Sequence, residues 1–223
     1  MKYPPITTKQ LSAIESQLSC PSGDKGVALG HTMHQSNIGM TLATIDALCI
    51  DEKDVVLEIG HGNCGHLKQI FAESEPAKYI GLEISKTMHE EAQKQLSAVD
   101  GATIEFKLYK GNTLPLESES INKIMTVNTV YFWKKPLSFF MEIARVLKKE
   151  GTCIVAFAEK SFMETLPFVN AKFRLYHLND IEMLSKQAGM ALRNTIYKKE
   201  MVKSKAGDLV ERRYILAILI KVK

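Results

Sequence analysis

The chain carries the segment DVVLEIGHGNCG at residues 54–65. Its first half is a nearly continuous apolar run, as expected for a strand that is covered on both faces. Glycines follow at once: Gly60 permits a tight turn, and Gly62 lets the backbone approach a ligand closely. The helix predicted next would present its free N–H groups to a negative group. The segment therefore predicts a buried strand, a cofactor-binding loop and a helix.

Working outward from this segment, short β-branched runs alternate with longer amphipathic stretches. This is the pattern of successive βα units around a mostly parallel sheet. We expect strands at 54–59, 78–83, 103–109, 121–127 and 152–158, and helices at about 64–74, 85–100, 136–149 and 179–188. Two final strands, 191–197 and 212–220, are expected to form a hairpin joined by an exposed connection at 198–211.

Residues 1–50 precede the first strand and are expected to be helical in pieces, at 8–18 and 40–48, with a Gly-, His- and Asn-containing stretch between them. We interpret 1–50 as a helical cap or lid and 51–223 as the α/β domain. At 223 residues and 45% hydrophobic content, both parts fit one structural domain.

Composition narrows the function classes. The formal charge of +4 arises from 29 basic and 25 acidic residues without a dense basic block, so a nucleic-acid partner is not expected. The four cysteines lie far apart and form neither a CxxC pattern nor a disulfide framework, and no metal site is expected. Because no segment approaches the roughly 18 apolar residues of a membrane span, we expect a cytoplasmic protein; its oligomeric state is left open.

Glu83 closes the second expected strand about 20 residues after the glycine loop, where a carboxylate accepts hydrogen bonds from ribose hydroxyls. The GxGxxG spacing alone also fits a dinucleotide site or an ordinary turn. These residues therefore predict a nucleoside-containing cofactor without naming it.

Four ordered motifs carry a resemblance: VVLEIGHGNCGHL at 55–67, YIGLEIS at 79–85, GNTLPLESESINKIMTVNTVYFW at 111–133 and ARVLKKEGTCIVAF at 144–157. In this order they resemble the class I S-adenosylmethionine-dependent methyltransferases of the broad small-molecule type. The resemblance covers about residues 30–157. It implies a Rossmann-like α/β fold with a seven-stranded, mostly parallel sheet, an antiparallel terminal hairpin and helices on both faces. It also implies S-adenosylmethionine as cofactor and direct SN2 methyl transfer to a small-molecule acceptor.

The resemblance further implies which residues hold the cofactor. The glycine loop and Asn128 would lie at the methionine end, Glu83 at the ribose, and Ile84 with residues 112–114 at the adenine. The implied cofactor-binding residues are Glu58, Gly60, Gly62, Asn63, Gly65, Glu83, Ile84, Met88, Asn112, Thr113, Leu114 and Asn128.

Three positions depart from the family pattern. Cys64 stands where a third glycine is frequent, and Asn112 and Asn122 stand where aspartates are common. An Asn carbonyl still accepts a hydrogen bond from the adenine amine, so the substitution at 112 keeps the expected contact chemically feasible.

Methyl transfer needs little covalent help from a protein, because positioning and desolvation are the main contributions. Some acceptors need a base, and we select Tyr131 and His34 as candidate catalytic residues, with His31 and His61 as further polar candidates. The alternative for the histidines is a surface or capping role. In the functional interpretation, their segment is a lid that directs Met33 and Asn37 toward the site. Tyr131, Phe132 and Trp133 could either pack at the end of the fourth strand or, for Tyr131 at least, line the acceptor pocket. A second aromatic set could either form an apolar acceptor wall or pack in the ordinary way: Phe162, Phe168, Phe173 and Tyr176.

Two other functions use the same loop. An NAD-dependent oxidoreductase would need a Tyr-Lys or His-Asp arrangement beside the nicotinamide, and the sequence offers no clear one. A non-catalytic protein that binds S-adenosylmethionine is left open by Cys64 and Asn112.

Overall fold

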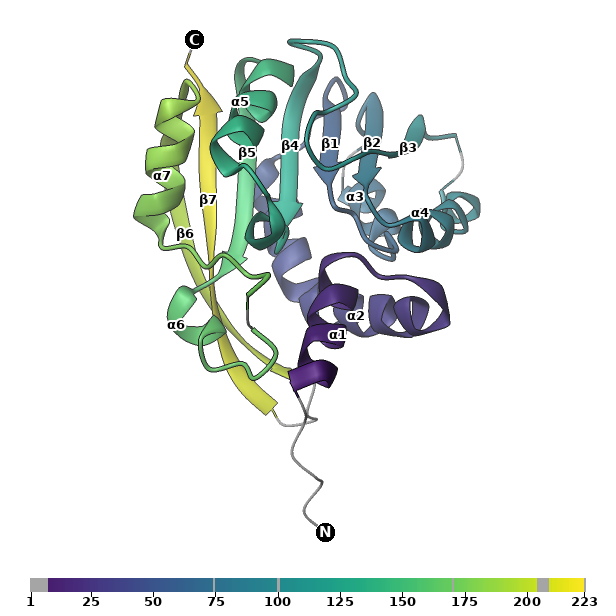
Figure 1. The fold of residues 1–223 in the computed structure, drawn as a ribbon. Helices are drawn as coiled ribbons and strands as arrows, with labels where there is room; N and C mark the ends of the chain where they lie inside the picture. The colour runs from purple at the N-terminus through teal and green to yellow at the C-terminus, as the bar shows by residue number, and fades with distance from the viewer. Residues whose placement is uncertain (1–7, 74, 100, 170, 204–208, 223) are drawn as a thin grey trace.

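The computed structural model describes residues 8–73, 75–99, 101–169, 171–203 and 209–222. One seven-stranded sheet runs through the molecule in the order β3-β2-β1-β4-β5-β7-β6. The strands β3, β2, β1, β4 and β5 are parallel to one another, and β7 runs antiparallel to both β5 and β6. The predicted α/β class, the seven strands and the reversed terminal hairpin are confirmed (Figure 1).

The strands are β1 Val55–Ile59, β2 Lys78–Glu83, β3 Ile104–Leu108, β4 Ile121–Val127, β5 Leu147–Ala158, β6 Met190–Lys203 and β7 Leu209–Lys221. The α-helices are α1 Thr8–Ser19, α2 Gly23–Leu48, α3 Leu67–Glu73, α4 Lys86–Gln93, α5 Pro136–Val146, α6 Lys160–Met163 and α7 Leu178–Gln187. Two short 3-10 helices, η1 Leu96–Ala98 and η2 Val130–Phe132, complete the described elements.

Helices cover both faces of the sheet, as predicted. Helices α5 and α7 lie on one face and α2, α3 and α4 on the other (Figure 1). Each face has its own core: Phe140 and Ile143 of α5 are fully buried on the first, and Met40 of α2 and Ile70 of α3 on the second. Because the central strands are covered twice, their apolar sequences are continuous rather than alternating.

The N-terminal region differs from the prediction, because the second helix begins at Gly23 and runs to Leu48, whereas it was expected only over 40–48. Glycine inside a helix costs about 1 kcal/mol relative to alanine, which favoured a break. Here the glycines allow close packing: a Cβ on Gly30 would lie 2.6 Å from Met88 Sδ, and one on Gly39 would lie on Glu200. Tertiary contacts with α4 and β6 therefore outweigh the local preference.

The terminal hairpin is longer than predicted. The expected exposed connection at 198–211 is strand at 198–203 and 209–211, whereas residues 204–208 lie outside the described residues. Cross-strand pairs continue beyond the predicted ends of the two strands, with Glu200 opposite Arg212 and Val202 opposite Val210. Opposite-charge pairs stabilise such neighbours, so a charged sequence does not exclude strand.

A second boundary also moves. Helix α5 ends at Val146 rather than near Lys149, and β5 starts at Leu147 rather than Thr152. Leu147 pairs with Ile121 of β4, so the polar residues that looked like a helix end continue the sheet.

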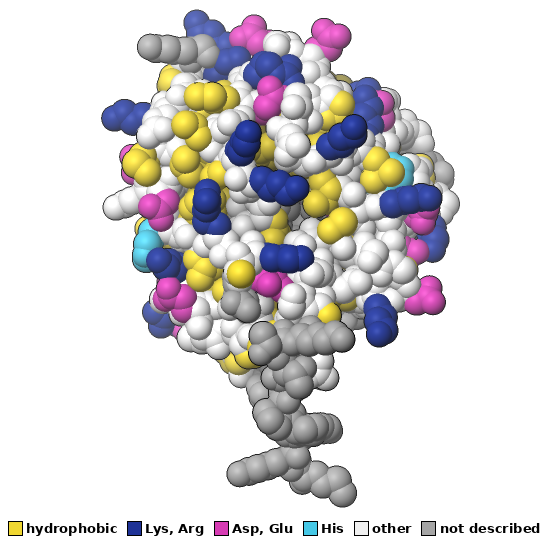
Figure 2. Space-filling view, in the orientation of Figure 1, with side chains coloured by type: hydrophobic (Ala, Val, Ile, Leu, Met, Phe, Trp, Pro, Cys, Tyr) yellow, Lys and Arg dark blue, Asp and Glu magenta, His cyan; other side chains and the backbone are white. Residues whose placement is uncertain are grey.

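Over the described ranges, we find no helix with the length and hydropathy needed to traverse a bilayer. On the face shown in Figure 2, the described Lys and Arg side chains are spread out, with apolar side chains exposed between them.

Candidate functional site

The glycine loop leaves β1 with Gly60 at φ +76° and Gly62 at φ +59°, both in the left-handed region that favours glycine. The Gly60 N–H donates to the carbonyl of Leu82 on β2 at 2.7 Å. A Cβ on Gly60 would lie 2.4 Å from Thr129 Cγ2, whereas one on Gly62 would meet nothing within 4 Å. Gly60 thus lets β1 pack against the turn after β4, and Gly62 leaves open space above the loop.

Cys64 occupies the place of the missing third glycine and still adopts a left-handed conformation, with φ +50°. Its side chain is fully buried, and its Sγ lies 3.5 Å from the hydroxyl of Tyr79. The loop therefore keeps the shape that a glycine would give, with the strain offset by packing.

Glu83 connects the end of β2 to the glycine loop. One carboxylate oxygen accepts the N–H groups of Ile84 at 2.7 Å and Ser85 at 2.9 Å, and the other accepts the N–H of Gly62 at 3.0 Å. A carboxylate offers about four lone-pair positions, so capacity for a ribose hydroxyl is left at this pocket-lining residue. The loop, its open space and Glu83 fit a nucleoside cofactor.

Glu58 lies beneath the loop and is 3% exposed. Its Oε2 accepts hydrogen bonds from Tyr79 OH at 2.5 Å and from His66 Nε2 at 2.8 Å. Burial alone would raise its pKa, but His66 and these two hydrogen bonds outweigh burial and lower the pKa of the carboxyl. Glu58, His66 and Cys64 place their ligand-type atoms within 4.8 Å of one another. Burial raises the pKa of the Cys64 thiol, and Cys64 contacts this group through the Tyr79 hydroxyl. Glu58, His66 and Tyr79 thus form a hydrogen-bonded support beneath the loop.

One pocket runs from the glycine loop past Glu83 to the ends of β4 and β5. It brings together ten of the predicted site residues: His34, Glu58, Gly60, Gly62, Asn63, Glu83, Ile84, Met88, Asn128 and Tyr131.

The other predicted residues do not line this pocket. Gly65 packs under His34, since a Cβ there would lie 2.9 Å from His34 Nε2. Asn112 and Thr113 are exposed, and Leu114 is a core residue whose N–H donates to Glu142 at 2.9 Å. Tyr109 and Gly111 line the pocket instead, with Gly111 next to Ile84. Gly111 begins the motif at 111–133 but was not assigned to the site, and Tyr109 lies outside all four motifs.

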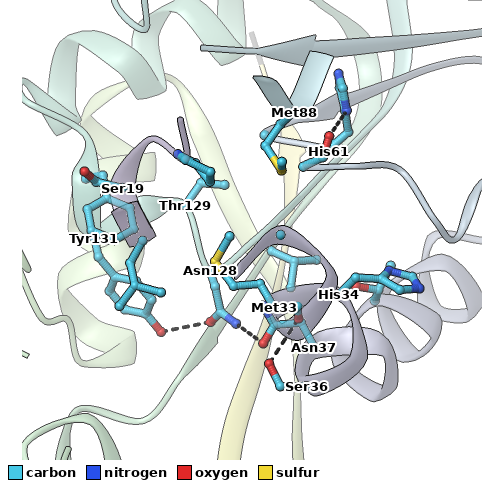
Figure 3. Close-up of a pocket in the computed structure, with 18 of the residues that line it drawn as sticks. Ser19, Met33, His34, Ser36, Asn37, His61, Met88, Asn128, Thr129 and Tyr131 are labelled. Carbon is cyan, nitrogen blue, oxygen red and sulfur yellow. Dashed lines mark hydrogen bonds between the residues drawn. The ribbon is translucent and has the colours of Figure 1, made fainter. Parts of the chain in front are cut away.

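Asn128 follows β4 in the left-handed conformation, with φ +57°, and both ends of its amide are held (Figure 3). Its Nδ2 donates to Asn37 Oδ1 at 3.1 Å, and its Oδ1 accepts from Tyr131 OH at 3.1 Å. Asn37 Oδ1 also accepts from Arg212 Nη1 at 2.8 Å, and Arg212 pairs with Glu200 at 2.6 Å. A polar chain therefore joins the terminal hairpin, helix α2 and the end of β4.

Arg212 is a pocket residue that the sequence analysis missed. It is the first residue of the expected last strand, directly after the segment expected to be an exposed connection, and its side chain is only 7% exposed. No local motif points to it, because its partners Asn37 and the Ser36 carbonyl are about 175 residues away.

The two candidate catalytic residues have different surroundings. Tyr131 is 2% exposed, its hydroxyl accepts the Ala158 N–H at 2.6 Å, and burial raises the pKa of its phenol well above the ordinary value. His34 is half-buried beside His66, with ring centroids 6.1 Å apart, and burial with the neighbouring histidines lowers its pKa. His34 is therefore suited to accept a proton at neutral pH, whereas the Tyr131 hydroxyl stays protonated and already donates to Asn128 Oδ1.

Asn122, the third departure from the family pattern, does not line the pocket and has a structural role. Its Oδ1 accepts the Val55 N–H at 3.0 Å and a Lys148 Nζ hydrogen bond at 3.0 Å, so it fastens β4 to the start of β1.

Comparisons with known proteins agree with this geometry. Residues 57–155 match a family model described as a methyltransferase domain. The uncharacterized methyltransferase YdaC of Bacillus subtilis (strain 168) is 24% identical over 126 residues, which is 56% of this chain and 68% of that protein.

Solved structures share the fold. A chain in the complex between the Haloferax volcanii Trm112 methyltransferase activator and a methyltransferase superposes with a TM-score of 0.71 at 14% identity, covering 96% of this chain and 98% of that one. The Haemonchus contortus phosphoethanolamine N-methyltransferase 2, solved with S-adenosylhomocysteine, gives 0.66 at 15% identity, covering 96% of this chain and 58% of that one.

The sheet order, the glycine loop and Glu83 define a Rossmann-like α/β protein with a binding site for a nucleoside cofactor. The methyltransferase-domain match over residues 57–155 and the fold shared with solved methyltransferases support a class I S-adenosylmethionine-dependent methyltransferase with S-adenosylmethionine as its cofactor. This cofactor supplies an electrophilic methyl group on a sulfonium centre. The NAD-dependent oxidoreductase that the loop alone permitted is set aside.

Proposed function

We propose that the protein transfers the methyl group of S-adenosylmethionine directly to a small-molecule acceptor. One observation carries this proposal: a single pocket joins the glycine loop and Glu83 to a second, apolar end near Tyr131 and Phe173. A donor and an acceptor held in one pocket need no covalent intermediate, because orientation supplies much of the rate.

The covering of the pocket supports a small acceptor. Residues of α1, α2 and the segment after α6 all line it. Glu15 of α1 is 2% exposed and accepts the Lys172 N–H at 2.6 Å, and Lys172 Nζ donates to Ser16 Oγ at 2.6 Å. Since α1 is fastened to this segment, the cap formed by α1 and α2 would exclude water from the pocket and favour a compact acceptor over a macromolecule.

Within this proposal, the chain's own residues bind and orient. Glu83 would hold the ribose, and the backbone at Gly60 and Gly62 the methionine end, next to Asn128. His34 would accept a proton where the acceptor must lose one, since its lowered pKa leaves it neutral. We further propose a cytoplasmic location, supported by four cysteines that are all free.

Cofactor binding is tested by thermal unfolding with S-adenosylmethionine, S-adenosylhomocysteine or NAD. At about 100 times the dissociation constant, a ligand should add roughly 2.7 kcal/mol of stability. We expect stabilisation by the adenosyl compounds and none by NAD. Glu83→Ala should abolish the effect, whereas Glu90→Ala, an exposed glutamate of α4, should retain it.

Acceptor size is tested with tritium-labelled S-adenosylmethionine and two fractions of a cell extract, a low-mass filtrate and the macromolecules retained above it. The proposal expects enzyme-dependent label in the filtrate. Label confined to protein or RNA would overturn the small-molecule acceptor. Binding without transfer to either fraction would favour a non-catalytic protein.

A further inference from the structure

The acceptor end of the pocket is made of aromatic rings. Tyr131, Phe132, Phe168 and Phe173 form a connected cluster, which we name the aromatic cluster. The Phe132 and Phe173 rings lie 4.7 Å apart, and Phe173 lies 5.9 Å from Tyr131 and 6.4 Å from Phe168. All four line the pocket, and the three phenylalanines are only partly buried. The cluster thus presents apolar surface that a ligand would cover.

Charged side chains do line the pocket, but each is compensated within the protein. Arg212 is paired with Glu200 and also donates to Asn37 and the Ser36 carbonyl. Glu83 is surrounded by backbone N–H groups, and Glu58 by His66 and Tyr79. A charged acceptor would lose water here without gaining an opposite charge, which is costly.

Most polar side chains at the acceptor end are also engaged with one another. The Asn128 amide is held by Asn37 and Tyr131, Ser36 Oγ donates to the Met33 carbonyl, and Thr129 Oγ1 lies 2.5 Å from Thr126 Oγ1. Among the described residues at the acceptor end, few donors and acceptors are left to converge on a polyhydroxylated acceptor, which would require several.

From these observations we infer that the acceptor is a neutral, mainly apolar molecule with a ring that packs on the aromatic cluster, methylated at a hydroxyl, thiol or amine substituent. This inference rests on the proposed function. In the transfer, a lone pair of the acceptor heteroatom bonds to the methyl carbon as the carbon–sulfur bond breaks. That electron pair remains on sulfur, giving S-adenosylhomocysteine, and the heteroatom's proton leaves to His34 or water.

The test measures binding of three probes of one shape and different charge: 2-naphthol, 2-naphthoate and 2-naphthylmethylammonium. Each is titrated calorimetrically into protein saturated with S-adenosylhomocysteine. We expect 2-naphthol to bind at least tenfold more tightly than either charged probe. Phe173→Ser should weaken 2-naphthol at least tenfold and leave the S-adenosylhomocysteine affinity within about twofold, while Phe173→Leu should restore most of the loss. Met183→Ser, which changes an exposed methionine of α7, should alter neither.

The inference is overturned if a charged probe binds as tightly as 2-naphthol, if 2-naphthol does not bind, or if Phe173→Ser has no effect. In each of these cases S-adenosylhomocysteine still binds, so the cofactor assignment stands. If the unaltered protein does not bind S-adenosylhomocysteine, that result counts against the proposed function itself.

Discussion

The two halves of the pocket are built in different ways. In the cofactor half, the glycine loop follows β1 and Glu83 ends the neighbouring strand β2. Backbone conformation and backbone N–H groups hold the two together. In the acceptor half, side chains come from α1, α2, the end of β4, the segment after α6 and β7, and they hold one another. A backbone-built site depends on a few glycines and one carboxylate, whereas a side-chain-built site can change by substitution. This difference explains how one fold can keep its cofactor while its acceptor varies.

The largest expected effect breaks the cofactor half at Gly60. Gly60→Ala places a Cβ in a left-handed conformation and 2.4 Å from Thr129 Cγ2. Strain and overpacking together should cost roughly 3 kcal/mol of unfolding free energy, with at least tenfold weaker S-adenosylhomocysteine binding. Urea unfolding and calorimetry measure both.

Gly62→Ala is the matched control, because its φ is similar but its Cβ meets nothing within 4 Å. It should cost only about 1 to 2 kcal/mol. Adding Thr129→Ser to Gly60→Ala removes the clashing methyl and should recover part of the loss. Equal losses for both glycine variants would show that close packing at Gly60 does not matter.

A smaller effect breaks the acceptor half at Arg212. Arg212→Met removes the partner of Glu200 and two hydrogen bonds to α2. Breaking a buried pair costs about 3 to 5 kcal/mol, and because Glu200 is 21% exposed we expect about 2 kcal/mol. The double variant Arg212→Met/Glu200→Gln should be less destabilised than Arg212→Met alone.

The same variant sharpens the comparison between the halves. Arg212 reaches Asn128, beside the expected methionine end, only through Asn37. If this chain transmits little to the cofactor half, Arg212→Met should change S-adenosylhomocysteine affinity by less than about threefold while it disturbs acceptor binding. A loss of cofactor affinity as large as that of Gly60→Ala would contradict the separation.

A third effect depends on pH and concerns His61, which is 4% exposed in the loop and packs 4.8 Å from the Phe106 ring. Its Nε2 has no hydrogen-bond partner among the described residues. Burial lowers its pKa despite the nearby Glu83 and Glu58 carboxylates, so the unfolded chain binds the proton more readily. Stability from this group is complete above pH 6.5 and is lost as pH falls through the lowered pKa, by at most about 1.4 kcal/mol per pH unit.

Urea unfolding at several pH values between 7.5 and 5 measures this slope. His61→Leu should reduce it, and His31→Gln, at an exposed histidine of α2, should leave it unchanged. An unaltered slope in His61→Leu would assign the pH dependence to other groups, with His34 the next candidate because burial also lowers its pKa.

Most residues predicted for the cofactor half line the pocket, because the determinants of their placement are local. The buried run before Gly60, Glu83 at the end of β2 and the Ser85 cap, whose Oγ accepts the Met88 N–H at 3.1 Å, are all within short segments. The acceptor half depends on contacts such as Arg212 with Asn37, which no local pattern encodes. The same reason explains why the start of α2 was predicted at residue 40 instead of residue 23: packing of Gly30 against Met88 outweighs helix propensity.

The smallest effect tests the adenine end, where the family resemblance and the geometry disagree. The resemblance assigns Asn112 to the adenine edge, but Asn112 is exposed and outside the pocket, whereas Tyr109 and Gly111 line it. If the geometry holds, Asn112→Ala should change the S-adenosylhomocysteine dissociation constant by less than about threefold, or roughly 0.6 kcal/mol. Tyr109→Ala should weaken it more, since a buried aromatic surface is lost. A tenfold loss in Asn112→Ala, near the value of one hydrogen bond, would instead mean that residues 111–114 close on the adenine when the cofactor binds.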